Sequence, residues 1–281
     1  MTDSWWLKFK RAQHHMVDIR REARRYARAH PYRTVPIRQP QHYDGVQRFR
    51  LEITEQPDPA IAIILGDFIH NLRSALDHVV VAATSPRSKR GDAGFPIATE
   101  NPWAKDANGK YVFRDPQRRK SIWKAINGVP LLAQAVIIGA QPYRVPDPEK
   151  DVLAVLNRLE NADKHRELIT IGSGLVWPRI IVVRPDDTLV SPPLGYGYGQ
   201  FVPDGAEIHL TVPLPTNTRV KMEFSGTPAV SIKVTPGGHN QPPIEFRLCE
   251  SMATALRNVR TLLRGLEPFA IRDRRSHRAS R

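Results

Sequence analysis

Several segments of the chain repeat an apolar residue every three or four positions, which is the period of an α-helix with one buried face. The first of these segments carries its stripe at Trp6, Phe9, Ala12, Met16, Ile19, Ala23 and Tyr26. Pro59 suits the first turn of the second segment, and Ser85 and Pro86 suit its end. The spacing therefore predicts helices over residues 4–29, 59–84, 116–126, 130–140, 149–165 and 247–267.

Other segments alternate apolar and polar residues, as half-buried strands do. Residues 48–54 show this alternation, with residues 34–37 as a possible partner strand. Between residues 168 and 246 the same pattern returns, interrupted by Pro, Gly and Asp. There the sequence predicts strands over residues 168–171, 179–183, 207–212, 219–224 and 230–234.

The order of these elements is helices, then strands, then one more helix, which indicates an α+β fold rather than alternating βαβ units. We expect a helical bundle, built from the first helix, the 59–84 and 149–165 helices and the last helix, packed with a mostly antiparallel β-rich segment. The parts of the chain would be a helical part over 1–166 with a short β excursion over 31–57, a β-rich part over 167–246, a helix over 247–268 that returns to the helical part, and a basic, disordered tail over 269–281.

The chain is strongly basic. It has 42 Lys and Arg residues against 28 Asp and Glu residues, which gives a formal net charge of +14. This balance favours a polyanionic partner, with nucleic acid, and RNA in particular, ahead of an anionic membrane surface. The first predicted helix supplies the candidate contacts to phosphate, Arg20, Arg21, Arg24, Arg25 and Arg28. The alternative is that these arginines form an ordinary solvated helix face.

The single cysteine, Cys249, excludes an intramolecular disulfide and a cysteine-based metal site, and it fits a reducing compartment. The apolar runs, such as that over 79–83, are too short to cross a bilayer, so we expect no transmembrane segment. The N-terminus has no apolar signal core, which makes the cytoplasm the expected location. No glycine-rich phosphate loop or serine nucleophile elbow precedes a predicted helix, and no cofactor is expected.

The 59–84 helix carries the chain's densest cluster of chemically capable side chains. Opposite its apolar stripe lie Asp67, His70, Asn71, Ser74, Asp77 and His78, with Arg73 at the edge. These polar residues are mostly short and form helices poorly, whereas a solvated face is usually rich in Lys, Glu and Gln. We therefore expect another part of the protein, a ligand or a second copy to meet this stripe. The alternative reading is a structural network in which Arg73 pairs with Asp77.

The 149–165 helix carries a second polar set near its C-terminal end. Asn157, Asn161 and His165 share one face at four-residue spacing. The cations Lys164, His165 and Arg166 also complement the helix dipole, which is their ordinary explanation. We take His70 and Ser74 together with Asn161, Lys164, His165 and Arg166 as candidate substrate-binding residues, and we expect the two polar helices to meet.

Two resemblances bear on these residues. The string at 66–78, Gly-Asp-Phe-Ile-His-Asn-Leu-Arg-Ser-Ala-Leu-Asp-His, followed by Phe-Pro-Ile at 95–97 and Asn-Ala-Asp-Lys-His-Arg at 161–166, resembles a widespread set of uncharacterised bacterial proteins. More loosely, Arg73 and His78, with four residues between them, resemble the Arg-x4-His signature of the HEPN superfamily of helical ribonucleases and toxins. Ser74 departs from that signature, which usually has Asn, Asp or His after the arginine.

The second resemblance implies RNA cleavage without a metal, in defence or as a toxin, with Arg73 and His78 catalytic and Asn71, Ser74 and Asp77 positioning. Residues five apart on a helix point about 140° away from each other, so a site made of both would draw on a two-fold interface, which implies a homodimer. The chemistry is coherent, because histidine exchanges protons near neutral pH and arginine can hold a phosphate.

Three functions therefore stay open at this point. The first, slightly favoured, is a non-enzymatic nucleic-acid-binding or assembly protein in which the stripe is structural. The second is the HEPN-like ribonuclease. The third is a metal-binding protein that uses His70, Asp77 and His78 with Asp163 or His165, although no local ligand spacing supports it.

Overall fold

The structure is a computed structural model that describes residues 3–29, 32–37, 46–85, 88, 92–109, 116–164, 171–183, 189–190, 201–203, 205, 207–211, 221–234 and 244–279. The helices are α1 (Ser4–Arg28), α2 (Ala60–Ala83), α3 (Pro116–Ile126), α4 (Leu131–Gly139), α5 (Val152–Lys164) and α6 (Leu248–Ala279), with short 3₁₀ turns at Pro142–Arg144 and Pro148–Lys150. The strands are β1 (Tyr32–Pro36), β2 (Val46–Ile53), β3 (Ile171–Val183), β4 (Leu189–Val190), β5 (Phe201–Pro203), β6 (Glu207–Thr211), β7 (Lys221–Val234) and β8 (Ile244–Arg247).

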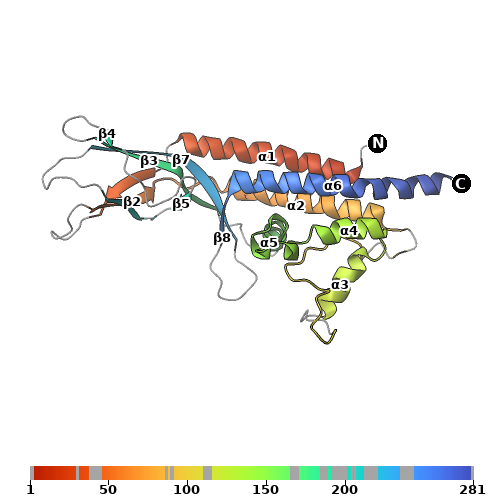
Figure 1. Cartoon of the computed structure of the whole chain (residues 1–281). Coiled ribbons are helices and arrows are strands. Elements are labelled where there is room, and N and C mark those ends of the chain that lie inside the picture. Colours follow the sequence, from red (N-terminus) through yellow and green to blue (C-terminus); the bar gives the residue numbers. More distant parts are fainter. Residues whose placement is uncertain are drawn as a thin grey trace.

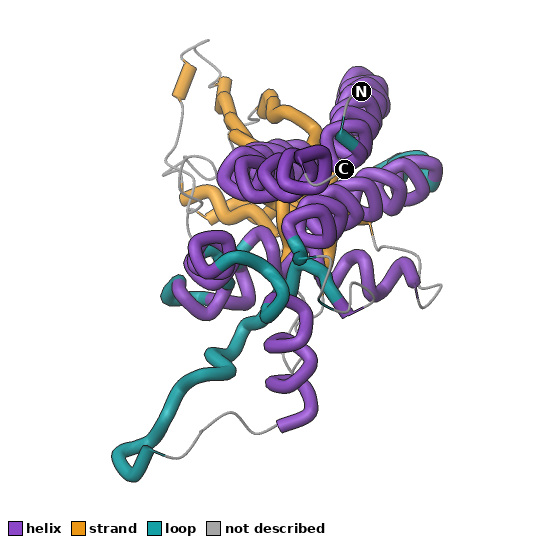
Figure 2. The backbone as a smooth tube through the Cα atoms, turned by 90° about the vertical axis from the view of Figure 1, so that its right-hand side faces the viewer, coloured by secondary structure: helices purple, strands orange, loops and turns teal. Residues whose placement is uncertain are grey.

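Three long helices, α1, α2 and α6, lie side by side and contact one another along their lengths (Figures 1 and 2). Their apolar stripes meet in the main core, which includes the fully buried Trp5, Phe68, Leu72 and Leu263. Complete burial of one such side chain stabilises the fold by about 1.5–3 kcal/mol. The bounds of α1 and α2 agree with the predicted helices 4–29 and 59–84 to within a residue at each end.

The shorter helices α3, α4 and α5 lie on the opposite side of the molecule from α1 (Figure 1). The apolar residues of α5, among them Leu156 and Leu159, are buried, and α5 contacts both α2 and α6. The predicted 149–165 helix therefore does meet the 59–84 helix. This contact places Glu160 of α5 beside Arg73 and His70 of α2.

The strands form two antiparallel sheets beyond one end of the helices (Figure 1). One sheet has the order β1-β2-β6, and β2 pairs with β6 so that Arg48 lies opposite His209. The other runs β4-β3-β7-β8, with β5 also paired to β3. Since α1 and α6 contact β7, the helices and strands join in one α+β architecture.

Three predicted boundaries are corrected. Residues 221–224 and 230–234 belong to one strand, β7, while residues 219 and 220 of the predicted strand lie outside the described residues. The predicted strand at 179–183 is the end of β3, whose bulge lies between Val176 and Arg179. The predicted strand at 168–171 lies outside the described residues except for Ile171. The division at residue 166 does not separate the sheets, because β6 completes the sheet of β1 and β2.

The tail expected at 269–281 is also corrected, because α6 continues through Pro268 to Ala279. A proline inside a helix removes one backbone hydrogen bond and would favour an earlier end. Tertiary packing opposes this effect, since Ala270 is completely buried in the core and Phe269 packs against it. The helix therefore extends beyond the point at which its local sequence predicts an end.

Candidate functional site

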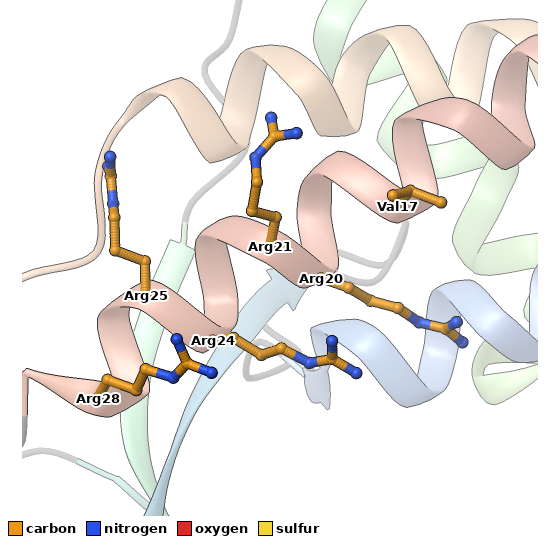
Figure 3. Close-up of a pocket in the computed structure, with 6 residues that line it drawn as sticks. All are labelled: Val17, Arg20, Arg21, Arg24, Arg25 and Arg28. Carbon is orange, nitrogen blue, oxygen red and sulfur yellow. The ribbon is translucent and has the colours of Figure 1, made fainter.

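The five arginines predicted to contact phosphate line one hollow at the C-terminal end of α1, together with Val17 (Figure 3). The hollow has a volume of about 540 Å³. Arg20, Arg24 and Arg28 follow each other at four-residue steps along α1, which places their Cα atoms about 6 Å apart along the helix axis. The sequence pattern alone would have allowed these side chains to scatter, but here they border one concave surface.

The five arginines differ in their partners. Arg21 pairs with Asp18 at 2.9 Å and with Glu22 at 3.3 Å. Arg25 pairs with Glu22 at 3.0 Å and with Asp58, which caps the start of α2, at 2.8 Å. These two arginines are therefore partly neutralised by carboxylates.

Within the described part of the chain, no carboxylate pairs with Arg20, Arg24 or Arg28, and all three side chains are exposed. Arg20 and Arg24 point toward the start of α6 in Figure 3. Burial raises the pKa of the Cys249 thiol at the start of α6, while Arg20 and Arg24 act on this pKa in the opposite direction. The uncompensated positive charge of this surface is therefore concentrated between α1 and α6.

The polar stripe of α2 has a different environment. Arg73 is only 8% exposed, and its Nε donates to Oε2 of the equally buried Glu160 on α5 at 3.0 Å. Its two terminal nitrogens donate to the carbonyl oxygen of Phe95 at 3.3 Å, and one lies 3.7 Å from Asp77 Oδ1. The guanidinium is thus fully engaged inside the protein, which favours the structural reading of this residue over a role in binding phosphate.

Asp77 completes this arrangement. Its Oδ1 accepts a hydrogen bond from the backbone N–H of Phe95 at 2.9 Å. Arg73 and Asp77 together therefore satisfy both backbone groups of Phe95, whose ring is buried in the core. Gln141 holds the next residues of the same segment, since its Nε2 donates to the Pro96 carbonyl at 2.9 Å and its Oε1 accepts from the Ala98 N–H at 3.0 Å. The polar residues fix the 95–98 segment to the helices.

His70 and Ser74 remain on the accessible part of the stripe. The His70 side chain is 53% exposed, and its Nδ1 lies 3.9 Å from Glu160 Oε1. Its Nε2 lies 3.5 Å from Ser74 Oγ. The histidine therefore lies between a hydroxyl and a buried carboxylate, with both distances at or beyond the limit of a hydrogen bond.

The other predicted residues are more dispersed. Asn71 donates from Nδ2 to the Asp67 carbonyl of its own helix at 2.7 Å, and His78 is half-buried and makes no contact with Arg73 among the described interactions. Asn161 is exposed and Asn157 half-buried on α5. Lys164 is the last residue of α5 and its side chain is not described, and His165 and Arg166 lie outside the described residues.

Sequence reasoning missed Glu160, which is the centre of the α2–α5 contact. A signal was present, because Glu160 follows Leu156 by four residues and Leu159 by one, so it falls on the apolar face of its helix. A carboxylate in that position is buried and needs a partner. The buried cation to match it, Arg73, is likewise next to the fully buried Leu72.

Two further results limit the possible chemistry. In the described part of the chain, no three His, Cys, Asp or Glu side chains come together as metal ligands would. His165, one of the residues proposed for a metal site, lies outside that part. Likewise, the search of the described helices found none with the length and apolar character that a membrane span requires.

Comparisons with known proteins add no family to this picture: no family model, no curated protein and no solved structure matches the chain.

Proposed function

We propose that this protein binds nucleic acid, RNA in particular, through the arginine surface of α1, and that the polar stripe of α2 serves mainly to hold the fold together. The observation that carries the proposal is the row of Arg20, Arg24 and Arg28, three exposed arginines without carboxylate partners in the described chain, on the border of one hollow. The net charge of +14 supports it.

The chemistry of such binding follows from the row itself. Arginine donates in a planar fork that matches two phosphate oxygens, and its charge is lost at no accessible pH. Steps of about 6 Å along the helix axis suit successive phosphates of a polynucleotide strand. The residues that line the described hollow include no aromatic side chain on which a base could stack. Binding through phosphates alone is independent of base sequence.

The proposal is tested by fluorescence anisotropy with labelled RNA oligonucleotides of unrelated sequence. The wild-type protein is expected to bind all of them with similar affinity and to lose affinity steeply as salt rises. The variant Arg20→Gln/Arg24→Gln/Arg28→Gln is compared with Lys120→Gln/Lys124→Gln/Arg144→Gln, which also removes three exposed charges, two on α3 and one in the 3₁₀ turn Pro142–Arg144. Helix α3 lies on the opposite side of the molecule from α1 (Figure 1). If both variants lose affinity equally, binding follows net charge and the α1 surface is not the site.

A second candidate function, cleavage of the bound RNA without a metal, is favoured by one observation. The exposed His70 lies within 4 Å of both the Ser74 hydroxyl and the buried Glu160 carboxylate. An exposed histidine beside a hydroxyl and a carboxylate is suited to proton transfer near neutral pH. In the HEPN-like assignment this step belongs to His78, with Arg73 holding phosphate. The engagement of Arg73 with Glu160 and Phe95 makes His70 the better candidate for it.

This second candidate is tested with purified protein, RNA and EDTA. If cleavage occurs, His70→Ala is expected to abolish it and His78→Ala to leave most of it, whereas the HEPN-like assignment predicts the reverse order. RNA that stays intact with the wild-type protein under conditions of saturated binding rejects the cleavage function and leaves the binding function in place.

A further inference from the structure

A second hollow lies beside the arginine surface, at the junction of α1 with the first turns of α6. It has a volume of about 450 Å³ and is lined by Arg20, Cys249, Glu250, Ala253, Thr254 and Arg257. Arg20 borders both hollows, so the concave surface continues from α1 onto α6. The floor on α6 is made of small side chains, which leaves space between the two helices.

Arg257 lines this hollow together with Arg20 and is held in place by its own helix. One terminal nitrogen of Arg257 donates to Thr254 Oγ1 at 2.9 Å, and that hydroxyl donates to the Glu250 carbonyl at 3.0 Å. The hydroxyl proton of Thr254 is thus used within the helix, and its oxygen orients the guanidinium. Among the residues the structure describes, Arg257 has no carboxylate partner.

One carboxylate, that of Glu250, also lines the hollow and would oppose an anion. It is engaged by Arg247, whose terminal nitrogen lies 2.8 Å from Glu250 Oε1. The other charged residues that line the hollow are the two cations Arg20 and Arg257. Two guanidinium groups that line one hollow among small residues are an arrangement suited to one phosphate group.

We infer that the hollow between α1 and α6 binds a phosphate of the RNA strand, with Arg20 on one side and Arg257 on the other, so that the strand crosses from α1 onto α6. This inference rests on the proposed function. It adds α6 to the contact surface and identifies Arg257, which the sequence did not single out, as a binding residue. The residues that line this hollow include no aromatic ring, so the contact recognises the phosphate group and not the base.

The experiment uses the position of Cys249, the chain's single cysteine, in the lining of the hollow. The full chain is treated with N-ethylmaleimide, an uncharged thiol reagent, with and without a saturating RNA oligonucleotide, and modification is followed by mass spectrometry. Bound RNA is expected to slow modification of Cys249 several-fold. Because burial raises the pKa of this thiol, its modification is expected to be slow, and a second reporter is placed beside it.

The reporters are Cys249→Ala/Ala253→Cys, inside the hollow, and Cys249→Ala/Thr261→Cys, about two turns further along α6. The first variant keeps Thr254 and its contact with Arg257. RNA is expected to protect the cysteine at 253 and to leave the one at 261 reactive. Arg257→Gln is expected to lower affinity several-fold and Arg264→Gln, an exposed arginine of α6 outside the hollow, to lower it less.

The outcomes separate the two proposals. If anisotropy shows that RNA is bound but the cysteine at 253 reacts as fast as in free protein, the phosphate site on α6 is wrong and the α1 surface stands. If RNA protects both reporters equally, the hollow is not a specific phosphate-binding site. If no RNA binds at low salt, the proposed function itself fails.

Discussion

Arginines in two regions of this molecule have opposite environments. Arg73 on α2 is 8% exposed, pairs with the buried Glu160 and donates to the Phe95 carbonyl. Arg20, Arg24 and Arg28 on α1 are exposed, and no carboxylate in the described chain pairs with them. Both groups lie on amphipathic helices of the same core, so the helical pattern does not distinguish them. What distinguishes them is whether a buried acid faces the guanidinium.

This difference shows that burial and pairing indicate the role of a basic side chain. A buried charge must be paired, because its removal from water costs several kcal/mol. Once paired it has few donors left for a ligand, which is the basis of the structural role that we propose for Arg73. An exposed, unpaired arginine has lost no hydration and keeps its donors for an anion. The contrast predicts large effects on stability at α2 and effects on binding at α1.

The largest expected effect is on stability. Arg73→Met removes the cation that lies 3.0 Å from the buried Glu160 carboxylate and the donors to the Phe95 carbonyl. We expect a loss of about 3–5 kcal/mol in the free energy of unfolding, the usual cost of removing one partner of a buried ion pair. Urea denaturation followed by circular dichroism measures it.

The control is Arg73→Met/Glu160→Met, which removes both charges. Since apolar residues of similar volume often replace a buried ion pair at little cost, the double variant is expected to recover most of the lost stability. A single variant as stable as the wild type would show that the α2–α5 ion pair does not hold the helices together, and the comparison with α1 would lose its basis.

The next effect is on affinity. Arg20→Gln/Arg24→Gln/Arg28→Gln is expected to weaken RNA binding about tenfold to a hundredfold, or roughly 1.4–2.8 kcal/mol. The slope of log affinity against log salt should fall by about 2–3, since each phosphate contact contributes about 0.7–0.9 to it. The same variant should unfold within about 0.5 kcal/mol per site of the wild type, as is usual for exposed positions. A triple variant that is destabilised but still binds would reverse the two assignments.

The sequence predicted much of the helical layer, because its signal is local. The stripe from Trp6 to Tyr26 places α1, and Pro59 with Asp58 marks the start of α2. The pairing of β2 with β6 could not be predicted, because the two strands lie more than 150 residues apart and alternation says nothing about partners. The extent of α6 beyond Pro268 was missed because it depends on the burial of Ala270.

The candidate site was predicted in part. The short side chains of the α2 stripe predicted that another part of the protein meets them. Asp77 does accept from the Phe95 backbone, but Asp67 and His70 are exposed and Asn71 bonds its own helix. Glu160 is met by Arg73, at the edge of the stripe. The pattern could not predict which of these side chains are buried, because their burial depends on where α5 packs against the stripe. The row on α1 was named from charge alone, but the hollow that continues onto α6 depends on how the two helices pack.

A smaller effect is expected at the segment that Arg73 and Asp77 hold. Asp77→Ala removes the acceptor of the Phe95 N–H, a bond of 2.9 Å. An unsatisfied backbone donor costs about 1–3 kcal/mol, and the half-buried position of Asp77 favours the low end. Hydrogen exchange measures the result, which should be faster exchange at Phe95 and Ala98 and unchanged exchange in α1. Equal acceleration in both places would show a general loss of stability and no local anchor.

The smallest effect extends the comparison of buried and exposed groups to two adjacent histidines of α1. His15 is buried and His14 is exposed. Burial lowers the pKa of His15 from its ordinary value of 6.5, while Asp67 of α2 opposes this shift. When the folded state has the lower pKa, the unfolded chain binds a proton first as pH falls, so the stability that His15 contributes is present above about pH 6.5 and declines below it.

The free energy of unfolding is expected to drop between pH 7 and pH 5, and His15→Gln is expected to reduce that slope whatever its effect on stability at pH 7. Gln13→Ala, at an exposed and uncharged position of the same helix, should keep the slope of the wild type. If His15→Gln leaves the profile as steep as in the wild type, burial is not what sets the proton affinity of this histidine, and the rule drawn from Arg73 and Arg20 does not extend to it.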